Sequence, residues 1–248
     1  FQGTASSLTY LDELLPIAKK DGAESVAVLA LKSAFTLACS QARVEQAKKL
    51  GIKVVYQTTY SLPSPDFSAI ALAIKNAHPD VVIGCTYFPD AVGIAKALHD
   101  QGFAPKFLAE TVGTVEPAFG QALGALANGI IGNTSWWPNF ETAGSKGIVA
   151  RYKARFHQDP DYHAITGYAA IEALGAAVKG TDSLDQAKLR DWLLHHSVAT
   201  VLGTFKVNPN GLSLGYEQYL VQWQNGALKL ITPAKFAQAK LIVPYPGS

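Results

Sequence analysis

Five residues that follow predicted strands have side chains suited to binding a small molecule. They are the aromatic Phe35, Tyr87 and Trp136, the acidic Glu110 and the hydroxyl-bearing Thr111. Ligand pockets are mostly apolar and aromatic, with a few polar groups that fix the orientation of the bound molecule. The carboxyl ends of parallel strands meet at one edge of a sheet, and ligands bind outside that edge. The pattern therefore predicts a ring-lined pocket in which Thr111, with Glu110 as a further or alternative group, provides the polarity.

Each of these rings also has a purely structural interpretation, because aromatic side chains commonly pack against helix ends. Phe35 follows the apolar run 25–31, and Tyr87 follows the run 81–84. A single ring in such a place would not distinguish packing from binding. Several strand ends converge at one edge, however, and this convergence favours the pocket.

The sequence carries no recognisable catalytic, metal or cofactor motif. It has no Walker loop, no Gly-x-Gly-x-x-Gly after a strand, no Gly-x-Ser-x-Gly elbow and no His-Glu-x-x-His. His195 and His196 are adjacent, so on a helix they would point roughly 100° apart and could not share a metal ion. We therefore expect a non-enzymatic protein with no cofactor and no metal.

The composition is that of an ordinary folded protein. Its 248 residues are 48% hydrophobic and 16% charged, with a formal charge of +2. These values exclude a disordered chain, which needs low hydrophobicity and high net charge. No apolar run approaches the roughly 18 residues that a membrane-spanning helix requires. The weak positive charge forms no basic stripe, so we expect no nucleic-acid partner.

The two cysteines, Cys39 and Cys85, are too few for a disulfide scaffold and lack the spacing of metal ligands. We interpret them as small buried hydrophobic residues, with a single disulfide as the alternative. The chain starts at Phe1, contains no Met and shows no signal peptide. We therefore expect a processed or truncated product, and secretion stays open because a mature protein has lost its signal.

Apolar, β-branched runs alternate with helical patterns through the first half of the chain. The predicted strands lie at 25–31, 53–56, 81–84, 107–109 and 129–132. Runs that are apolar on both faces are typical of parallel strands covered by helices on both sides. The predicted helices lie at 8–18, 34–50, 67–74 and 89–102. This alternation predicts an α/β fold with a doubly wound parallel sheet.

Beyond Trp136 the pattern becomes mainly helical. Helices are predicted at 148–156, 162–179 and 184–195, and strands at 201–207, 216–224 and 228–231. The last two strands are joined by Asn225-Gly226, a strong hairpin signal. The helices have no parallel sheet to cover, which predicts an incomplete second α/β lobe. We therefore divide the chain into residues 1–137 and 138–248.

Several segments resemble one known family in their order and spacing. They are Asp66-Phe67-Ser68-Ala69, Pro79-Asp80-Val81-Val82, Tyr87-Phe88-Pro89-Asp90-Ala91, Arg151-Tyr152-Lys153-Ala154-Arg155-Phe156, Gly167-Tyr168-Ala169-Ala170, Leu202-Gly203-Thr204-Phe205 and Val221-Gln222-Trp223-Gln224-Asn225-Gly226. Over nearly the whole chain the sequence resembles the substrate-binding proteins of ABC importers with the type I periplasmic binding fold. The similarity is to the branch for branched-chain amino acids, amides and aromatic acids.

The resemblance implies two lobes that are joined by crossing strands and that hold a ligand between them. Residues 1–137 would be lobe two, and residues 138–248 the returning part of lobe one with the C-terminal strands. The family's opening segment supplies the first strands of lobe one and its contacts with the ligand carboxylate. That segment has no counterpart in this sequence.

The resemblance also implies roles for single residues. Phe35 corresponds to an aromatic lid residue, and Tyr87 to a ring or polar group that meets the ligand. Either Glu110 or Thr111 corresponds to the acid that faces the ammonium of amino-acid ligands. Trp136 corresponds to an aromatic residue before the crossing in the amide and aromatic-acid branch.

We therefore expect a periplasmic or otherwise extracytoplasmic binding protein that passes a small amino acid, amide or aromatic carboxylate to an ABC permease. One departure is Leu31-Lys32, where many family members have acidic residues. The same fold also occurs in effector-binding domains of transcription regulators and receptors, which is the alternative. An α/β enzyme is disfavoured because the catalytic motifs are absent.

Overall fold

The computed structural model describes residues 1–61 and 66–247. The chain divides into two compact units: unit 1 consists of Phe1–Ser6 and Ser135–Gln218, and unit 2 of Ser7–Thr134 and Tyr219–Ser248. The large sheet belongs to unit 2, whereas unit 1 is mainly helical. Within the described ranges, no helix is long and apolar enough to cross a membrane.

The described part of unit 2 contains a seven-stranded sheet with the order β2-β1-β3-β4-β5-β8-β9. The strands are β1 (Ser25–Leu31), β2 (Lys53–Tyr60), β3 (Val81–Cys85), β4 (Phe107–Glu110), β5 (Ile131–Thr134), β8 (Tyr219–Gln224) and β9 (Ala227–Leu230). Strands β1 to β5 run parallel, and β8 and β9 are antiparallel. The predicted parallel α/β sheet is therefore confirmed.

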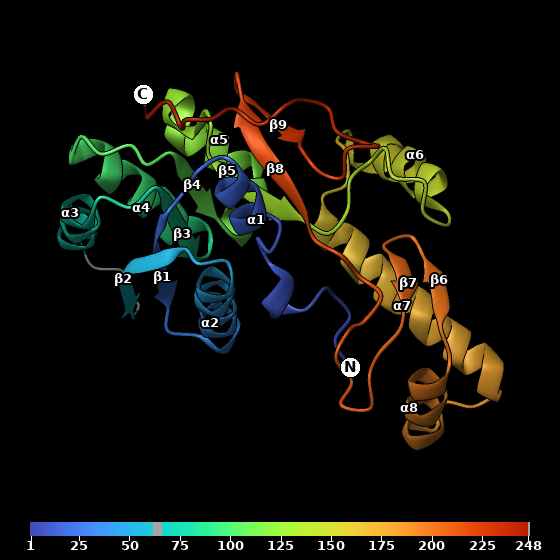
Figure 1. Cartoon of the computed structure of the whole chain (residues 1–248). Helices are drawn as coiled ribbons and strands as arrows, with labels where there is room; N and C mark the ends of the chain where they lie inside the picture. The colour runs from blue at the N-terminus through green and yellow to red at the C-terminus, as the bar shows by residue number, and fades with distance from the viewer. Residues whose placement is uncertain (62–65, 248) are drawn as a thin grey trace. The chain divides into compact units, whose positions relative to one another are not determined.

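Helices cover both faces of this sheet (Figure 1). The helices of unit 2 are α1 (Leu14–Lys20), α2 (Ala34–Lys49), α3 (Ser68–Ala77), α4 (Phe88–Asp100) and α5 (Pro117–Leu123), with 3₁₀ turns η1 (Ser7–Thr9), η2 (Val112–Val115) and η3 (Gly124–Ala127). Helices α1 and α2 share one hydrophobic core with the sheet, and α3, α4 and α5 share the other.

The alternation of side chains along β1 explains why its sequence is apolar throughout. Val26 and Val28 belong to the core under α1 and α2, whereas Ala27 and Leu29 belong to the core under α3 and α4. Successive residues of a strand point to opposite faces, so a strand covered on both sides needs an unbroken apolar run.

Local signals in the sequence set several helix starts. Ser33 caps α2, because its hydroxyl accepts from the backbone N–H of Thr36 and the Thr36 hydroxyl accepts in return from Ser33. Helix α4 begins at Phe88, and Pro89 occupies its first turn, where a missing N–H costs nothing. The helix predicted at 8–18 is wrong in its first half. Leu11 adopts a left-handed φ of 58°, so only α1 is an α-helix.

The last two strands join the sheet of unit 2. Asn225 and Gly226 both have positive φ, as a two-residue hairpin turn requires. Ile131 of β5 pairs with Gln222 of β8 in antiparallel register. The sequence interpretation placed these strands with residues 138–248, whereas their hydrogen bonds connect them to the βα repeats. Pairing between β5 and β8 is non-local and leaves no local signal.

Unit 1 contains three helices and one hairpin in its described residues. They are α6 (Ser145–Phe156), α7 (Tyr162–Thr181), α8 (Gln186–His195), β6 (Val198–Thr200) and β7 (Gly203–Phe205). The single strand predicted at 201–207 is wrong, because the chain turns at Val201 and Leu202 and β6 pairs with β7. Two distant groups bind the turn: the Glu172 carboxylate accepts from the Val201 N–H, and the Thr142 hydroxyl donates to the Val201 carbonyl.

Candidate ligand-binding site

Four of the five predicted site residues lie at the carboxyl edge of the parallel strands in unit 2. Phe35 is in the first turn of α2, directly after β1, and Tyr87 precedes α4, directly after β3. Glu110 ends β4, and Thr111 follows it. The centroids of the Phe35 and Tyr87 rings are 5.8 Å apart at an interplanar angle of 41°. The structure therefore brings the two rings together, as the strand-end argument predicts.

The ring pair has both a packed side and a solvent-facing side. The Tyr10 ring meets Phe35 edge to face, with centroids 4.9 Å apart, and Tyr10 is buried. Tyr87 is 38% exposed. The partly exposed Tyr87 ring and the half-buried Phe35 beside it offer an apolar wall to a small molecule.

Glu110 is fully buried, with a relative exposure of 0%. Its Oε2 accepts a hydrogen bond of 2.6 Å from the Thr86 hydroxyl. Within the described residues its Oε1 has no hydrogen-bond partner. Burial raises the pKa of this carboxyl well above its ordinary value, the Thr86 hydrogen bond lowers it, and the Asp90 carboxylate raises it further.

A glycine on the neighbouring strand makes room for this carboxyl group. Gly84 of β3 is paired with Glu110 of β4 in the sheet. A Cβ atom at Gly84 would lie 1.9 Å from Glu110 Oε2, which is impossible without displacing the carboxyl. The space for a buried acid therefore depends on the absence of a side chain at Gly84.

Thr111 uses its hydroxyl to tie together the loops after β3 and β4. The hydroxyl donates to the Thr86 carbonyl at 2.7 Å and accepts from the Thr86 N–H at 2.8 Å. The sequence left open whether Glu110 or Thr111 provides the polar group of the site. The Thr111 hydroxyl is already hydrogen-bonded to backbone groups of Thr86. The Oε1 atom of Glu110 is the one with unused hydrogen-bonding capacity.

Three further residues complete this buried polar cluster and were not among the predicted site residues. They are Thr86, Tyr60 and Asp90. The Tyr60 hydroxyl donates to Asp90 Oδ2, and the Tyr87 N–H donates to Asp90 Oδ1 at 3.0 Å. Burial raises the pKa of Asp90 although the Tyr60 hydrogen bond opposes this, and burial likewise raises the pKa of Tyr60.

Two of these residues could have been found from the sequence. Thr86 directly follows β3, so the strand-end argument applies to it as it does to Tyr87. Tyr60 ends β2, but the predicted strand stopped at Tyr56, four residues too early. Asp90 lies in the first turn of α4, and only the fold brings it to Tyr60.

Trp136 follows β5 by two residues but belongs to unit 1. It is 1% exposed and is among the largest fully buried side chains of the described residues. A ring that is buried to this extent contributes strongly to the stability of its unit. Its role in ligand contact stays a prediction.

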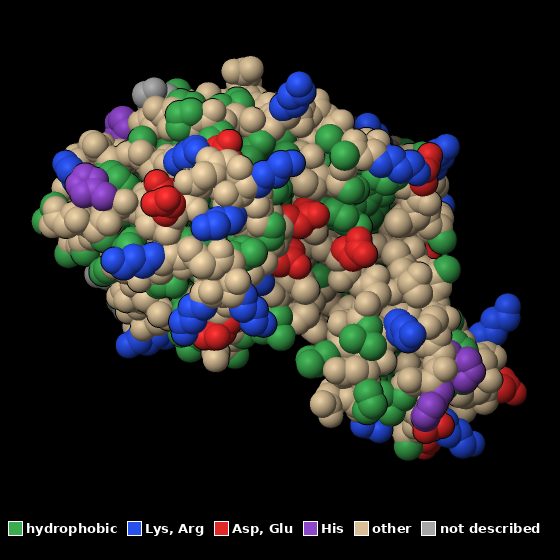
Figure 2. Space-filling view, in the orientation of Figure 1, with side chains coloured by type: hydrophobic (Ala, Val, Ile, Leu, Met, Phe, Trp, Pro, Cys, Tyr) green, Lys and Arg blue, Asp and Glu red, His purple; other side chains and the backbone are tan. Residues whose placement is uncertain are grey.

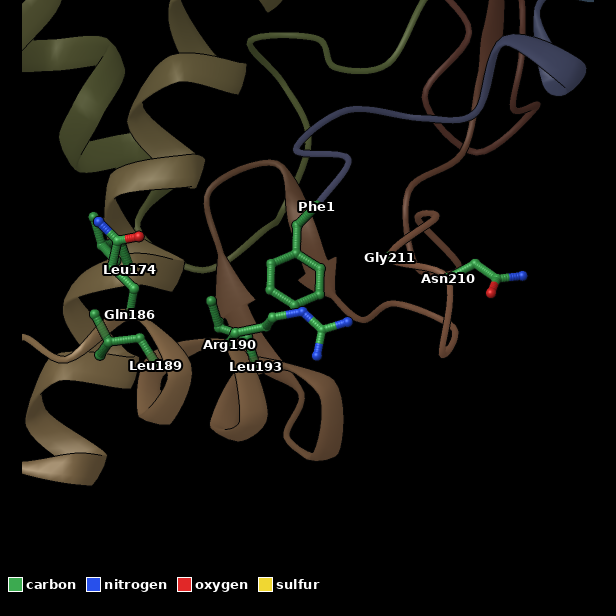
Figure 3. A pocket seen from close by; sticks show the side chains of 8 residues that line it. All are labelled: Phe1, Leu174, Gln186, Leu189, Arg190, Leu193, Asn210 and Gly211. Atoms are coloured by element: carbon green, nitrogen blue, oxygen red, sulfur yellow. The ribbon is translucent and has the colours of Figure 1, made fainter.

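One pocket outside this site has a different chemistry. This pocket, of about 400 Å³ in unit 1, is lined by Phe1, Leu174, Gln186, Leu189, Arg190, Leu193, Asn210 and Gly211. Figure 3 shows the side chains that line this pocket, among them Phe1 and Arg190. No carboxylate is among these lining residues, so an ammonium group would find no negatively charged partner among them. No cluster of metal-binding side chains occurs in the described part of the chain.

The visible surface carries mixed charges. On the face shown in Figure 2, lysine and arginine side chains are interspersed with aspartate and glutamate. Such a face lacks the basic stripe of a nucleic-acid-binding surface.

Comparison with known proteins gives a consistent family assignment. A family model described as a periplasmic binding protein matches residues 3–227. An amino acid binding protein of Pseudomonas aeruginosa is 27% identical over 206 residues, covering 82% of this chain and 54% of that protein. The Leu/Ile/Val/Thr-binding protein of Salmonella typhimurium is 25% identical, covering 90% of this chain and 58% of that protein. This chain therefore spans little more than half the length of these relatives.

Solved structures share the fold. A leucine binding protein from Thermotoga maritima superposes with a TM-score of 0.81 at 20% identity, covering 89% of this chain and 63% of that one. A leucine-, isoleucine-, valine-, threonine- and alanine-binding protein from Brucella ovis, in its closed conformation, has a TM-score of 0.75 at 20% identity, covering 97% and 60%.

Proposed function

Because this chain belongs to the periplasmic binding protein family, we propose that it is part of a solute-binding protein that captures an aliphatic amino acid. The two curated relatives named above are called binding proteins for amino acids, and the name of the Salmonella protein specifies leucine, isoleucine, valine and threonine. The proposed partner is an ABC permease, and the proposed location is extracytoplasmic. The proposed activity is non-enzymatic capture and release.

The observation that carries the ligand class is the buried carboxyl of Glu110 next to an aromatic wall. An amino-acid ligand brings an ammonium group, which must be paired once it leaves water. Glu110 Oε1 is buried and has no hydrogen-bond partner among the described residues. An ammonium group can donate to that oxygen while Thr86 keeps its bond to Oε2.

The apolar wall fits the side chain of such a ligand. Phe35 and Tyr87 present neighbouring rings at the same sheet edge, and Tyr87 is partly exposed. An aliphatic side chain placed there would bury apolar area on both partners.

Ligand binding to Glu110 requires a local opening of the structure. Glu110 is 0% exposed, so an ammonium reaches Oε1 only after the surrounding side chains open toward the sheet edge. Binding that opens this cluster should therefore be slower than diffusion allows.

Calorimetric titration of the full-length protein tests the ligand class. L-leucine should bind, whereas 4-methylpentanoate, which is leucine without its amino group, should bind much more weakly because it cannot pair with Glu110. Tighter binding of 4-methylpentanoate or benzoate would contradict an amino-acid ligand and favour an aromatic or simple carboxylic acid. A helix-turn-helix segment elsewhere in the full-length protein would instead favour a transcription regulator.

A further inference from the structure

Two buried thiols meet beneath the candidate binding edge. Cys39 lies in the second turn of α2, and Cys85 is the last residue of β3. Their Sγ atoms are 2.7 Å apart, and both residues are 0% exposed. This separation is less than 1 Å longer than the roughly 2.05 Å of a disulfide bond.

The fold holds both residues firmly in this position. Cys85 points to the same face of β3 as Val81 and Ile83, and all three share one hydrophobic core with Cys39. Cys85 is also paired with Ala30 of β1, inside the parallel sheet. The two sulfur atoms therefore meet because a covered helix face and a central strand pack together, and not through a loop that could drift away.

We propose that Cys39 and Cys85 form an intrachain disulfide that ties α2 to β3 in the mature protein. Disulfides persist in oxidising compartments, where proteins of this family act. The bond would close a chain segment whose ends are 46 residues apart. A cross-link over a segment of this length restricts the unfolded chain and stabilises the folded one.

The chemistry is thiol–disulfide exchange with a disulfide oxidant such as glutathione disulfide. One cysteine thiolate attacks the oxidant and releases one thiol, which leaves a mixed disulfide on the protein. The second cysteine thiolate then attacks the protein sulfur of the mixed disulfide and releases the second oxidant thiol. Two S–H bonds and the oxidant's S–S bond are replaced by one protein S–S bond and two oxidant thiols. Because both sulfurs are buried in the folded protein, the exchange takes place during folding.

A buried cation lies near the two thiols in the folded protein. Arg43 lies one helical turn after Cys39 on α2 and is only 4% exposed. One of its nitrogens donates to the Leu8 carbonyl at 2.6 Å, and its other guanidinium nitrogens have no partner among the described residues. Burial raises the pKa of the Cys85 thiol, whereas the Arg43 charge lowers it. The pKa of this thiol nevertheless stays well above its ordinary value once it is buried, so we expect thiolate attack before the two cysteines are enclosed.

The bond would also steady the candidate binding site, a consequence that rests on the proposed function. Phe35 lies one turn before Cys39 on α2, and Tyr87 lies two residues after Cys85. The two residues that carry the paired rings are therefore attached to the two elements that the disulfide joins. The disulfide itself is tested below without any ligand, so its failure would not affect the proposed function.

Alkylation followed by mass spectrometry provides the direct test. The full-length protein is refolded with glutathione disulfide, denatured without reductant, alkylated with iodoacetamide and digested with trypsin. The expected product links the peptides 33–43 and 76–96, which contain Cys39 and Cys85, and reduction separates them. Alkylation of both cysteines before reduction, or glutathione adducts without the linked peptide, would overturn the proposal.

Thermal unfolding provides an independent readout. The oxidised wild-type protein should lose about 5–15 °C of melting temperature when a phosphine reductant is added. The double variant with Cys39→Ala and Cys85→Ala serves as the matched control and should not respond to the reductant. An equal response of both proteins, or none in the wild type, would contradict a stabilising disulfide.

Discussion

Glu110→Gln separates a ligand-binding acid from a merely structural one. The substitution keeps the size and shape of the side chain, and the amide oxygen can still accept from the Thr86 hydroxyl. It removes the negative charge that would pair with a ligand ammonium. Glu110 is fully buried, so this pairing would occur away from water.

The expected loss follows from that burial. Removing one partner of a buried, hydrogen-bonded charge pair costs at least about 2 kcal/mol, or roughly a 30-fold increase in Kd. Part of the gain from pairing is spent on ionising a carboxyl whose pKa is raised by burial. The expected effect on L-leucine is therefore near the lower end of the range for buried pairs.

The assay is calorimetric titration of wild type, Glu110→Gln and Glu45→Gln with two ligands. Glu45→Gln is the matched control, because it makes the same change at a side chain that is 53% exposed and whose ion pair, among the described residues, is with Lys48. Glu110→Gln should weaken L-leucine about 30-fold and leave 4-methylpentanoate unchanged or slightly tighter. The reasoning is refuted if both ligands lose affinity equally, or if leucine binding is unaffected.

Three further predictions concern the same region. Gly84→Ala should destabilise the protein by about 1–3 kcal/mol in denaturant titration, because its Cβ collides with the Glu110 carboxyl, and Gly167→Ala, where nothing lies within 4 Å, should not. Trp136→Ala should cost about 3–5 kcal/mol of stability, because the ring is buried. The same substitution at the partly exposed Trp137 should cost less. A smaller loss of stability for Trp136→Ala together with weaker ligand binding would identify Trp136 as a contact residue instead. The pKa of Glu110 is raised in the folded protein, so the folded protein holds this proton more tightly than the unfolded chain does. The stability that this proton contributes is complete below the pKa of the unfolded chain. It is lost as pH rises through the pKa of the folded protein. The melting temperature of Glu110→Gln should fall less over that interval than that of the wild type, and parallel curves would exclude Glu110 as the cause.

The central strands of the sheet were predictable because they are buried on both faces. The run at β1 is apolar at every position after Ser25, and turn residues such as Asn225-Gly226 mark a hairpin. Such patterns reflect local burial and backbone conformation, which neighbouring residues largely determine. The turn at Val201 was not predictable in this way, because the groups that hold it come from Thr142 and Glu172.

In the candidate site, too, the features set by the ends of strands were predictable, and the contacts between distant elements were not. Phe35 and Tyr87 were predicted to meet because each lies a few residues after the end of a parallel strand, and their rings do meet. The partners of the acid were not predicted, since Tyr60 and Asp90 are 30 residues apart in sequence and are joined only by the packing of α4 over the sheet. Hydrogen-bond partners across elements leave no periodic signal, whereas strand ends do.

The energetic cost of Glu110 itself favours a functional role. A buried carboxyl with one oxygen unpartnered is expensive, and replacing it with a neutral residue of the same size commonly stabilises a protein. Gly84 adds to this cost, because a strand interior without a side chain is weaker than one with alanine. A purely structural core would be expected to fill that space with apolar atoms. If Glu110→Gln raises the melting temperature at neutral pH while it weakens leucine binding, the acid is maintained for the ligand; if it lowers both stability and affinity, the carboxyl acts mainly as part of the core.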